Sequence, residues 1–140
     1  MSSSIIVLGS VQDGGYPQSG CKLPCCSEVI EKNRYVSCLS IVDSNTKEYC
    51  LIDITPDFKQ QIKLIQNSVD SMVPSGIFLT HAHSGHYTGL LEFGREVMNT
   101  SEIPVYVMPK MKDFIIRNTL LNELVKNNNI KLSLISENVE

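Results

Sequence analysis

The sequence has no cluster of basic residues and no long apolar segment. Lys and Arg total 12 against 15 Asp and Glu, and they form no basic stripe of the kind that a nucleic-acid backbone requires. We therefore expect no nucleic-acid partner. The first apolar stretch, IIVL, follows no positive charge and is too short for a signal segment or a membrane span. We expect a cytoplasmic protein without a membrane partner.

The sequence also lacks the paired cysteines of a disulfide framework. It has five cysteines, an odd number, and three of them (Cys21, Cys25 and Cys26) fall within GCKLPCC. In a reducing compartment this pattern favours metal binding over disulfide bonds. A structural zinc needs four ligands, so the fourth would come from elsewhere, and reduced cysteines without a metal are the alternative. Cys38 and Cys50 lie in apolar runs, where we expect small buried side chains.

Histidine occurs in one place only. The three histidines (His81, His83 and His86) lie within THAHSGH. Imidazole is a common ligand of zinc, and a metal site needs several ligands around one point. His81 and His83 can point the same way from an extended segment, and a tight turn at Gly85 can bring His86 back toward them. We therefore predict a metal site on these histidines.

Two other interpretations of the histidines are open. They could be surface side chains without a ligand. They could also include a general base, but no nucleophile with a recognisable setting lies nearby, because Ser84 is too unspecific. The nitrogen ligands do not choose between zinc, iron, manganese and nickel.

Apolar runs bounded by turn residues predict six strands. They are SIIVLGS (ending at Gly9), YVSCLSIVD, EYCLIDI, SGIFLT, IPVYVMP and IKLSLI, and SNTK predicts a hairpin between the second and third. The first strand is followed by a loop rich in Gly, Pro and Cys at about residues 10–27. The histidines follow the fourth strand directly.

Helical spacing of apolar residues predicts three helices between these strands. One begins at Thr55-Pro56-Asp57 with Thr55 as its N-cap, the second covers Tyr87–Met98 and the third covers Lys110–Lys126. Alternating strands and helices predict a single α/β layered domain over residues 1–140. The histidines then lie at a corner between a strand and a helix.

Two aspartates are candidate site residues. Asp53 ends a predicted strand near the histidine corner, where its carboxylate could hold the ring N–H of a histidine, as carboxylates do for metal-binding histidines. Asp53 is therefore the candidate catalytic residue, in a supporting role. Asp57 is more simply an acid in the first turn of a helix, where it suits the helix dipole.

At the histidines the sequence resembles the metallo-β-lactamase superfamily, whose motif is T-H-x-H-x-D-H. Thr80, His81, His83 and His86 match this motif, and Gly85 stands where the family has aspartate. VLGSVQDGGYPQSGCKLPCC and GHYTGL resemble the pyrroloquinoline quinone biosynthesis protein B (PqqB) branch, and LIDITPD falls where the superfamily has a strand that ends in aspartate.

The resemblance implies an αββα fold of which this chain resembles the first αβ half, a mixed sheet with helices on one side. It implies a PqqB-like metal-dependent hydrolase, in which a metal-bound hydroxide attacks an ester or phosphodiester-like small molecule. Because Gly85 cannot bind a metal, the resemblance implies one ion, most simply zinc, at the histidines. A second, structural zinc would lie at the cysteine loop.

The superfamily fold is about twice as long as this chain, and no histidine follows His86 to complete the family's sites. We therefore expect a fragment that is inactive alone, or a chain completed by another chain, for example as a homodimer through the exposed half-sheet. The altered motif also leaves a second function open. The protein could be a metal-binding carrier or partner in cofactor biosynthesis that has lost catalysis.

Overall fold

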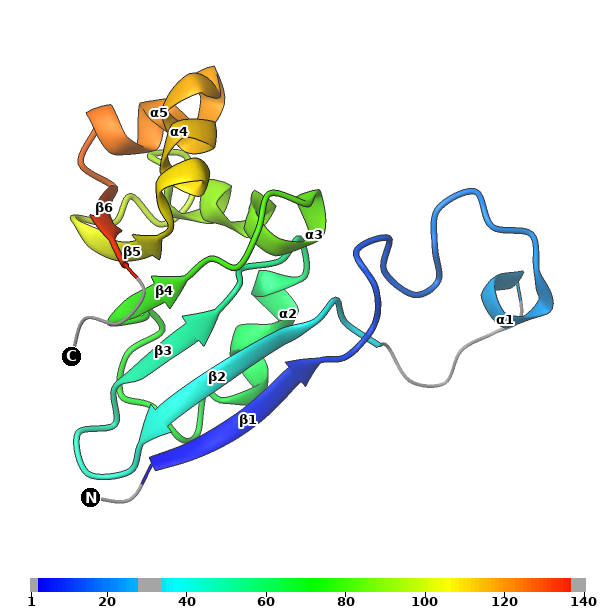
Figure 1. The fold of residues 1–140 in the computed structure, drawn as a ribbon. Helices are drawn as coiled ribbons and strands as arrows, with labels where there is room; N and C mark the ends of the chain where they lie inside the picture. Colours follow the sequence, from blue (N-terminus) through cyan, green and yellow to red (C-terminus); the bar gives the residue numbers. More distant parts are fainter. Residues whose placement is uncertain (1–2, 28–33, 137–140) are drawn as a thin grey trace.

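The computed structural model describes residues 3–27 and 34–136, which form one mixed sheet with helices (Figure 1). The sheet has six strands, and neighbours in the sheet are neighbours in the sequence. The strands are β1 (Ser3–Gly9), β2 (Cys38–Asp43), β3 (Tyr49–Ile52), β4 (Gly76–Phe78), β5 (Ile103–Val107) and β6 (Ile130–Leu134). Five of them lie within segments that the sequence predicts as strands, and β1 begins one residue before its predicted segment, so the α/β prediction is confirmed.

The direction of the strands brings three loops to one edge of the sheet. β1 and β3 are both antiparallel to β2, whereas β3, β4, β5 and β6 pair in parallel. β1 therefore runs in the same direction as the four parallel strands. The carboxyl ends of β1, β3 and β4 lie at the same edge, and the loops that follow them carry Asp13, Asp53 and the histidines.

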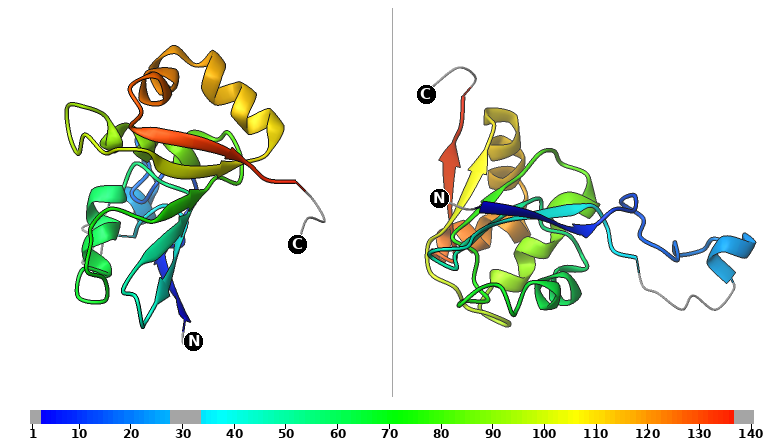
Figure 2. Two further views of the ribbon diagram at one scale, coloured as in Figure 1. Left: turned by 90° about the vertical axis from the view of Figure 1, so that its left-hand side faces the viewer. Right: turned by 90° about the horizontal axis from the view of Figure 1, so that it is seen from below.

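The helices connect the parallel strands. They are α2 (Phe58–Gln61) with the 3-10 helix η1 (Ile62–Leu64), α3 (Ser84–Tyr87) with the 3-10 helix η2 (Thr88–Phe93), and α4 (Pro109–Arg117) with α5 (Thr119–Lys126). Connections between parallel strands are right-handed, so successive crossovers in one direction fall on the same face. The two views of Figure 2 show these helices on one side of the twisted sheet. No helix in the described ranges has the length and apolarity needed to cross a bilayer.

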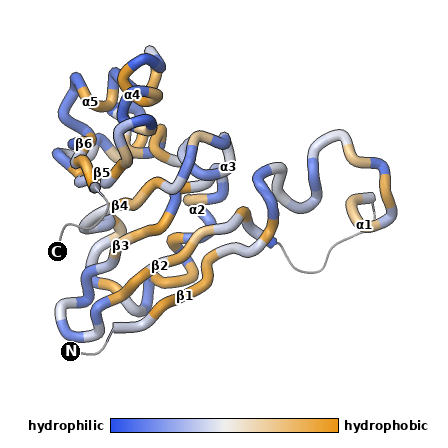
Figure 3. Tube along the Cα trace, in the orientation of Figure 1, coloured by the Kyte–Doolittle hydropathy of each residue, from blue (hydrophilic) through white to orange (hydrophobic). Residues whose placement is uncertain are grey.

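The core lies between the helices and the inner face of the sheet. Alternate residues of β2 and β5 are buried, as period-two strands with one covered face require. The apolar segments of Figure 3 follow these strands. Core side chains come from both layers and include Leu8, Val42, Leu51, Ile77, Val105, Phe58, Leu90, Phe93 and Ile115. On the outer face, Ile5 and Val7 are 70% and 62% exposed.

The first predicted helix begins later than the sequence suggests. Thr55 is not its N-cap, because the Thr55 hydroxyl accepts a hydrogen bond from the Asp57 N–H at 3.0 Å in a turn before the helix. α2 begins only at Phe58. Asp57 occupies the N-cap position, but its carboxylate accepts a hydrogen bond from the Val36 N–H at 2.9 Å. This contact ties the start of the helix to the segment before β2.

The other two helices also differ from the prediction. The second begins at Ser84 and ends as a 3-10 helix at Phe93, where Gly94 is extended. The third is broken at Asn118 into α4 and α5. The Asn118 side chain accepts hydrogen bonds from the N–H groups of Leu120 and Leu121 and so caps α5. Apolar periodicity continues across this break, so it gave no sign of the cap.

Candidate metal centre

Asp53 is fixed at the edge of the sheet by its backbone. It directly follows β3 and has a φ of 63°, in the left-handed region that aspartate tolerates better than most residues. Its N–H donates to the carbonyl of Phe78 at the end of β4, at 2.8 Å. The residue is 5% exposed, so its carboxylate is held inside the corner between β3 and β4.

The Asp53 carboxylate sets the orientation of His81 through Thr80. The Thr80 hydroxyl lies 2.9 Å and 2.8 Å from the two Asp53 oxygens and 2.9 Å from His81 Nδ1. A hydroxyl has one proton, and a carboxylate only accepts. Thr80 therefore donates to Asp53 and accepts from His81 Nδ1–H. This pattern assigns the proton of a neutral His81 to Nδ1 and leaves Nε2 free to bind a metal.

The same carboxylate orients His86. Asp53 Oδ2 accepts from His86 Nδ1 at 2.7 Å, and Asp13 Oδ1 accepts from His86 Nε2 at 2.8 Å. The backbone holds the ring in place, because the Ile54 N–H donates to the His86 carbonyl at 3.0 Å. With Nδ1 occupied by Asp53, Nε2, which contacts Asp13, is the nitrogen that could bind a metal. One buried carboxylate thus orients two imidazoles, as carboxylates beside metal-binding histidines do.

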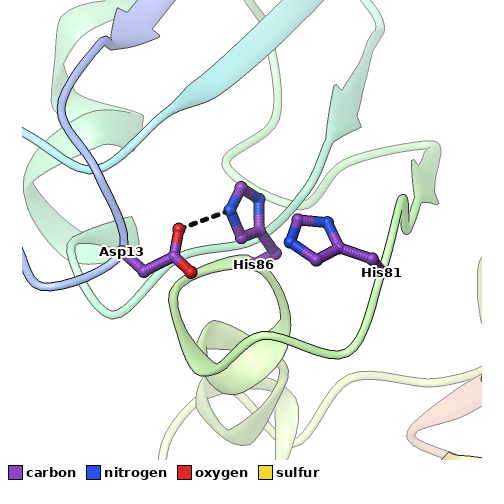
Figure 4. Close-up of side chains that lie close together, drawn as sticks. All are labelled: Asp13, His81 and His86. Atoms are coloured by element: carbon purple, nitrogen blue, oxygen red, sulfur yellow. Dashed lines mark hydrogen bonds and ion pairs between the residues drawn. The ribbon is translucent and has the colours of Figure 1, made fainter.

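Asp13, His81 and His86 converge on one point (Figure 4). Each offers a ligand atom, and these atoms lie within 4.8 Å of one another. Two imidazole nitrogens and a carboxylate oxygen suit zinc and similar ions. Ligand atoms of a tetrahedral zinc are about 3.4 Å apart, so movements on the order of 1 Å would close this group around an ion. The residues therefore fit a metal.

His83, the third predicted histidine ligand, lies beside this group and outside it. Its side chain is 72% exposed, and its Nδ1 is 3.1 Å from Asp13 Oδ2. The His81 and His83 rings are 4.6 Å apart between centroids, slightly farther than the 4.2 Å between His81 and His86. A ligand role for His83 stays a prediction.

The structure does not gather the predicted cysteine ligands with the histidines. Cys25 and Cys26 lie on α1 (Pro24–Ser27), with 3.9 Å between their sulfurs, and Figure 1 shows α1 at the far end of the long loop, away from the sheet. Within residues 3–27 and 34–136, no cysteine, Cys21 included, joins a metal-like cluster. A cysteine zinc stays a prediction. The core prediction is confirmed for Cys38, which is buried, and that burial raises its thiol pKa to about 12. It is wrong for Cys50, which is only half-buried because its side chain lies on the outer side of β3.

Asp13 is the site residue that the sequence analysis missed. It lies in the Gly-rich loop after β1, far along the chain from the histidines. The order and direction of the strands could have indicated Asp13. A strand that starts a meander of three runs parallel to the third, so the loop after the first strand reaches the same edge as the residue after the third. An aspartate close after β1 was therefore a candidate.

The charges around His86 favour its protonated form when no metal is bound. Burial alone lowers the pKa of His86, but the hydrogen bonds to Asp53 and Asp13, together with their negative charges, outweigh burial and raise that pKa. The hydrogen bond from His86 in turn lowers the pKa of Asp13. The site therefore attracts a positive charge, whether a proton or a metal ion.

The metal-free chain is expected to lose stability as the pH rises above neutrality. Because the folded pKa of His86 is raised, its contribution is complete below the unfolded value of about 6.5 and is lost as the pH rises through the folded value. Asp13 acts in the opposite range, since its contribution is lost as the pH falls through its lowered pKa. Urea unfolding in EDTA from pH 5 to 9 measures the alkaline decline, and an extension of the series below pH 4 measures the acid limit set by Asp13. His86→Gln should remove the alkaline decline, and an equal decline in that variant would contradict the assignment.

A polar hollow opens beside Asp13. Its volume is about 330 Å³, and its lining includes Asp13, Tyr16, Arg34, Asp57 and Gln60. The Arg34 guanidinium lies 5.1 Å from the centre of the Tyr16 ring, in the range of a cation–π contact. Arg34 thus lines the same hollow as the carboxylate that contacts His86 and the carboxylate of Asp57.

Two curated proteins are similar in sequence to part of the chain. Coenzyme PQQ synthesis protein B of Klebsiella pneumoniae (strain 342) is 35% identical over 96 residues, which cover 62% of this chain and 31% of that protein. Octanoyltransferase of Porphyromonas gingivalis (strain W83) is 33% identical over 112 residues, which cover 79% of this chain but 21% of that protein. The chain therefore spans a third or less of these relatives. No family model matches the chain.

Solved structures match nearly the whole chain. Zinc-bound PqqB of Methylobacterium extorquens has a TM-score of 0.76 at 21% identity, over 99% of this chain and 47% of that one. YhfI of Bacillus subtilis, a metallo-β-lactamase fold protein, has a TM-score of 0.60 at 14% identity, over 98% and 48%. The chain has the metallo-β-lactamase fold. A diphosphatase of the PhnP family shares this fold with a TM-score of 0.71 at 21% identity, over 99% and 52%.

The metallo-β-lactamase fold was expected from the histidine motif and the PqqB-like segments, and this resemblance is confirmed. The chain spans about half the length of the solved proteins that it matches. In the described part of the fold, the candidate metal centre lies at the carboxyl ends of the strands. Ligands of α/β sheets generally bind at this edge.

Proposed function

We propose that the protein is a metal-dependent hydrolase whose metal is held at the histidine loop. The observation that carries this proposal is the shared support from Asp53, which orients His81 through Thr80 and His86 directly. Metal-binding histidines commonly donate their second ring N–H to a carboxylate, and Asp53 supplies such a partner here. Zinc is the ion we propose, and the fold shared with zinc-bound PqqB supports this choice.

A bound zinc would lower the pKa of coordinated water to roughly 7 and so supply a nucleophile at neutral pH. His81 and His86 would hold the ion through Nε2, because Nδ1 of each is engaged by Thr80 or Asp53. Asp53 would stay buried below them and keep the rings from rotating. Its negative charge would also strengthen both imidazoles as donors to the ion.

The hollow beside Asp13 supports an anionic substrate. Arg34 in its lining offers planar, bidentate hydrogen bonding of the kind that suits a phosphate or carboxylate group. The fold shared with a diphosphatase agrees with this preference. We therefore propose phosphodiesters ahead of neutral esters.

A second candidate is a metal-binding protein of cofactor biosynthesis that does not hydrolyse esters. The observation in its favour is the 35% identity with Coenzyme PQQ synthesis protein B over 62% of this chain. This candidate keeps the metal and the orienting role of Asp53. It differs from the hydrolase in the role of the ion, which would bind a small molecule or a partner and would not activate water.

The experiment that tests the proposal combines metal content with hydrolysis. Protein purified without chelator is analysed for zinc, iron, manganese and nickel, and assayed with bis(4-nitrophenyl) phosphate and 4-nitrophenyl acetate. We expect about one zinc per chain. We expect the dimer to hydrolyse the phosphodiester, in a reaction that stops with EDTA and returns with Zn²⁺. Zinc without hydrolysis of either ester would favour the second candidate. Absence of any bound metal would contradict both.

The same preparation tests a proposed homodimer. The outer sheet face, with Ile5 and Val7 largely exposed, is apolar enough to pair with a second copy. Sedimentation at two protein concentrations gives the mass in solution. We expect a dimer through this face, and a monomer at both concentrations would contradict it.

A further inference from the structure

Residue 85 is a glycine because another residue occupies the space of its side chain. A Cβ built on Gly85 would lie 2.7 Å from Cα, 2.9 Å from Cβ and 3.2 Å from the carbonyl oxygen of Asp13. Side chains do not approach a backbone this closely, since packed carbon atoms are about 3.5 to 4.0 Å apart. No aspartate fits at position 85 while the loop after β1 stays in place.

The side chain of Asp13 points from that space into the histidine cluster. Its Oδ1 is 2.8 Å from His86 Nε2, and its Oδ2 is 3.1 Å from His83 Nδ1. The loop holds the residue in a hydrogen-bonded turn, because the Gly15 N–H donates to the Gln12 carbonyl at 2.9 Å. Both carboxylate oxygens thus face imidazole nitrogens, and the backbone that carries them is ordered by its own turn.

The position of Asp13 meets the needs of a zinc ligand. It belongs to the group of ligand atoms that lie within 4.8 Å of one another, together with His81 and His86. Its contact is with Nε2 of His86, the nitrogen left free by Asp53. An ion that replaced the proton between His86 Nε2 and Asp13 Oδ1 would find both ligand atoms already pointing toward each other.

We propose that Asp13 is a carboxylate ligand of the metal site and that Gly85 is required to admit it. This inference rests on the proposed metal centre. In this chain the carboxylate comes from the loop after β1. The histidine loop has no side chain at position 85, and this leaves space for Asp13. Asp13 and Gly85 therefore act as a matched pair.

Zinc titration of the metal-free protein against a chelating dye tests the ligand role. We expect Asp13→Asn to weaken Zn²⁺ binding about 100-fold, the upper end of what loss of a supporting group costs a metal site. Asp70→Asn, an exposed aspartate on the turn before β4, is the matched control and should bind as the unchanged protein does. Circular dichroism checks that both variants are folded.

Gly85→Ala tests the spatial half of the proposal without removing a ligand. The added methyl group should displace Asp13 and weaken Zn²⁺ binding at least about 10-fold, whereas Ser84→Ala at the neighbouring exposed position should not.

The outcomes separate this inference from the proposed function. If Asp13→Asn binds zinc normally while His81→Ala does not, the ligand role of Asp13 is overturned and the metal centre stands. If Gly85→Ala binds zinc as tightly as Ser84→Ala, the pairing of Asp13 with Gly85 is overturned. A protein that binds no zinc at all overturns the proposed function and this inference together.

Discussion

Replacing Asp53 by alanine is expected to lower the free energy of unfolding of the metal-free chain by about 3 kcal/mol. Three donors lose a charged acceptor: the Thr80 N–H, the Thr80 hydroxyl and His86 Nδ1. Hydrogen bonds to charged groups contribute about 1.5 to 3 kcal/mol each, reduced here because Thr80 is exposed. Alanine at a φ of 63° adds about 1 kcal/mol of backbone strain.

Urea unfolding in EDTA measures this loss, and Asp53→Asn is the matched variant. Asparagine tolerates the same backbone conformation and can still accept from Thr80, but it carries no charge. We expect it to retain much of the stability and to lose metal affinity about 10-fold or more, since an amide supports His86 less well than a carboxylate. Equal stability of Asp53→Ala and the exposed control Asp70→Ala would contradict a supporting role for Asp53.

The second large effect is expected at the histidines, with His86 ahead of His83. His86→Ala should weaken zinc binding by at least about 100-fold, because it removes a ligand and leaves Asp53 and Asp13 without their shared partner. His81→Ala should come close to it. His83 is 72% exposed and lies outside the ligand group, so His83→Ala should weaken binding by less than about 10-fold.

Hydrolysis of the preferred ester, measured at saturating Zn²⁺, gives an independent order for the same variants. We expect His86→Ala and His81→Ala to lose most of the activity and His83→Ala to keep the larger part. The sequence alone favours a different order, because spacing pairs His81 with His83 on one extended segment. A loss at His83 as large as that at His86 would support the order from spacing and contradict the order from the structure.

The sequence predicted the strands well because each is a short apolar run bounded by turn residues. It predicted the helices less well, because their ends depend on contacts outside the local pattern. Asn118 breaks the last helix by capping α5, and Asp57 is held by Val36 from the segment before β2. Neither contact can be predicted from the spacing of the apolar residues.

The residues of the candidate site also differ in how far they could be predicted from the sequence. The histidine cluster is local in sequence and could be read directly. The contact of Asp53 with His86 joins residues 33 positions apart, and it could be anticipated because both lie at predicted strand ends. The contact of Asp13 with His86 spans 73 positions. It required the knowledge that β1 and β3 run in the same direction, which no single segment reveals.

Gly85 shows how a local pattern can mislead. Taken within the motif, a glycine in place of an aspartate indicates a missing ligand. In the folded chain it is the point where the backbone of the histidine loop meets Asp13. The motif therefore indicates a lost ligand at Gly85, whereas the fold shows a packing contact there.

The shared direction of β1, β3 and β4 has a consequence for how such proteins diversify. Loops that end at one edge of a sheet can exchange the task of presenting a side chain, since each reaches the same point in space. An ancestral carboxylate could be lost from one loop and regained on another while the strands stay unchanged. Lineages on this scaffold would then conserve a binding geometry more faithfully than the linear motif by which they are recognised.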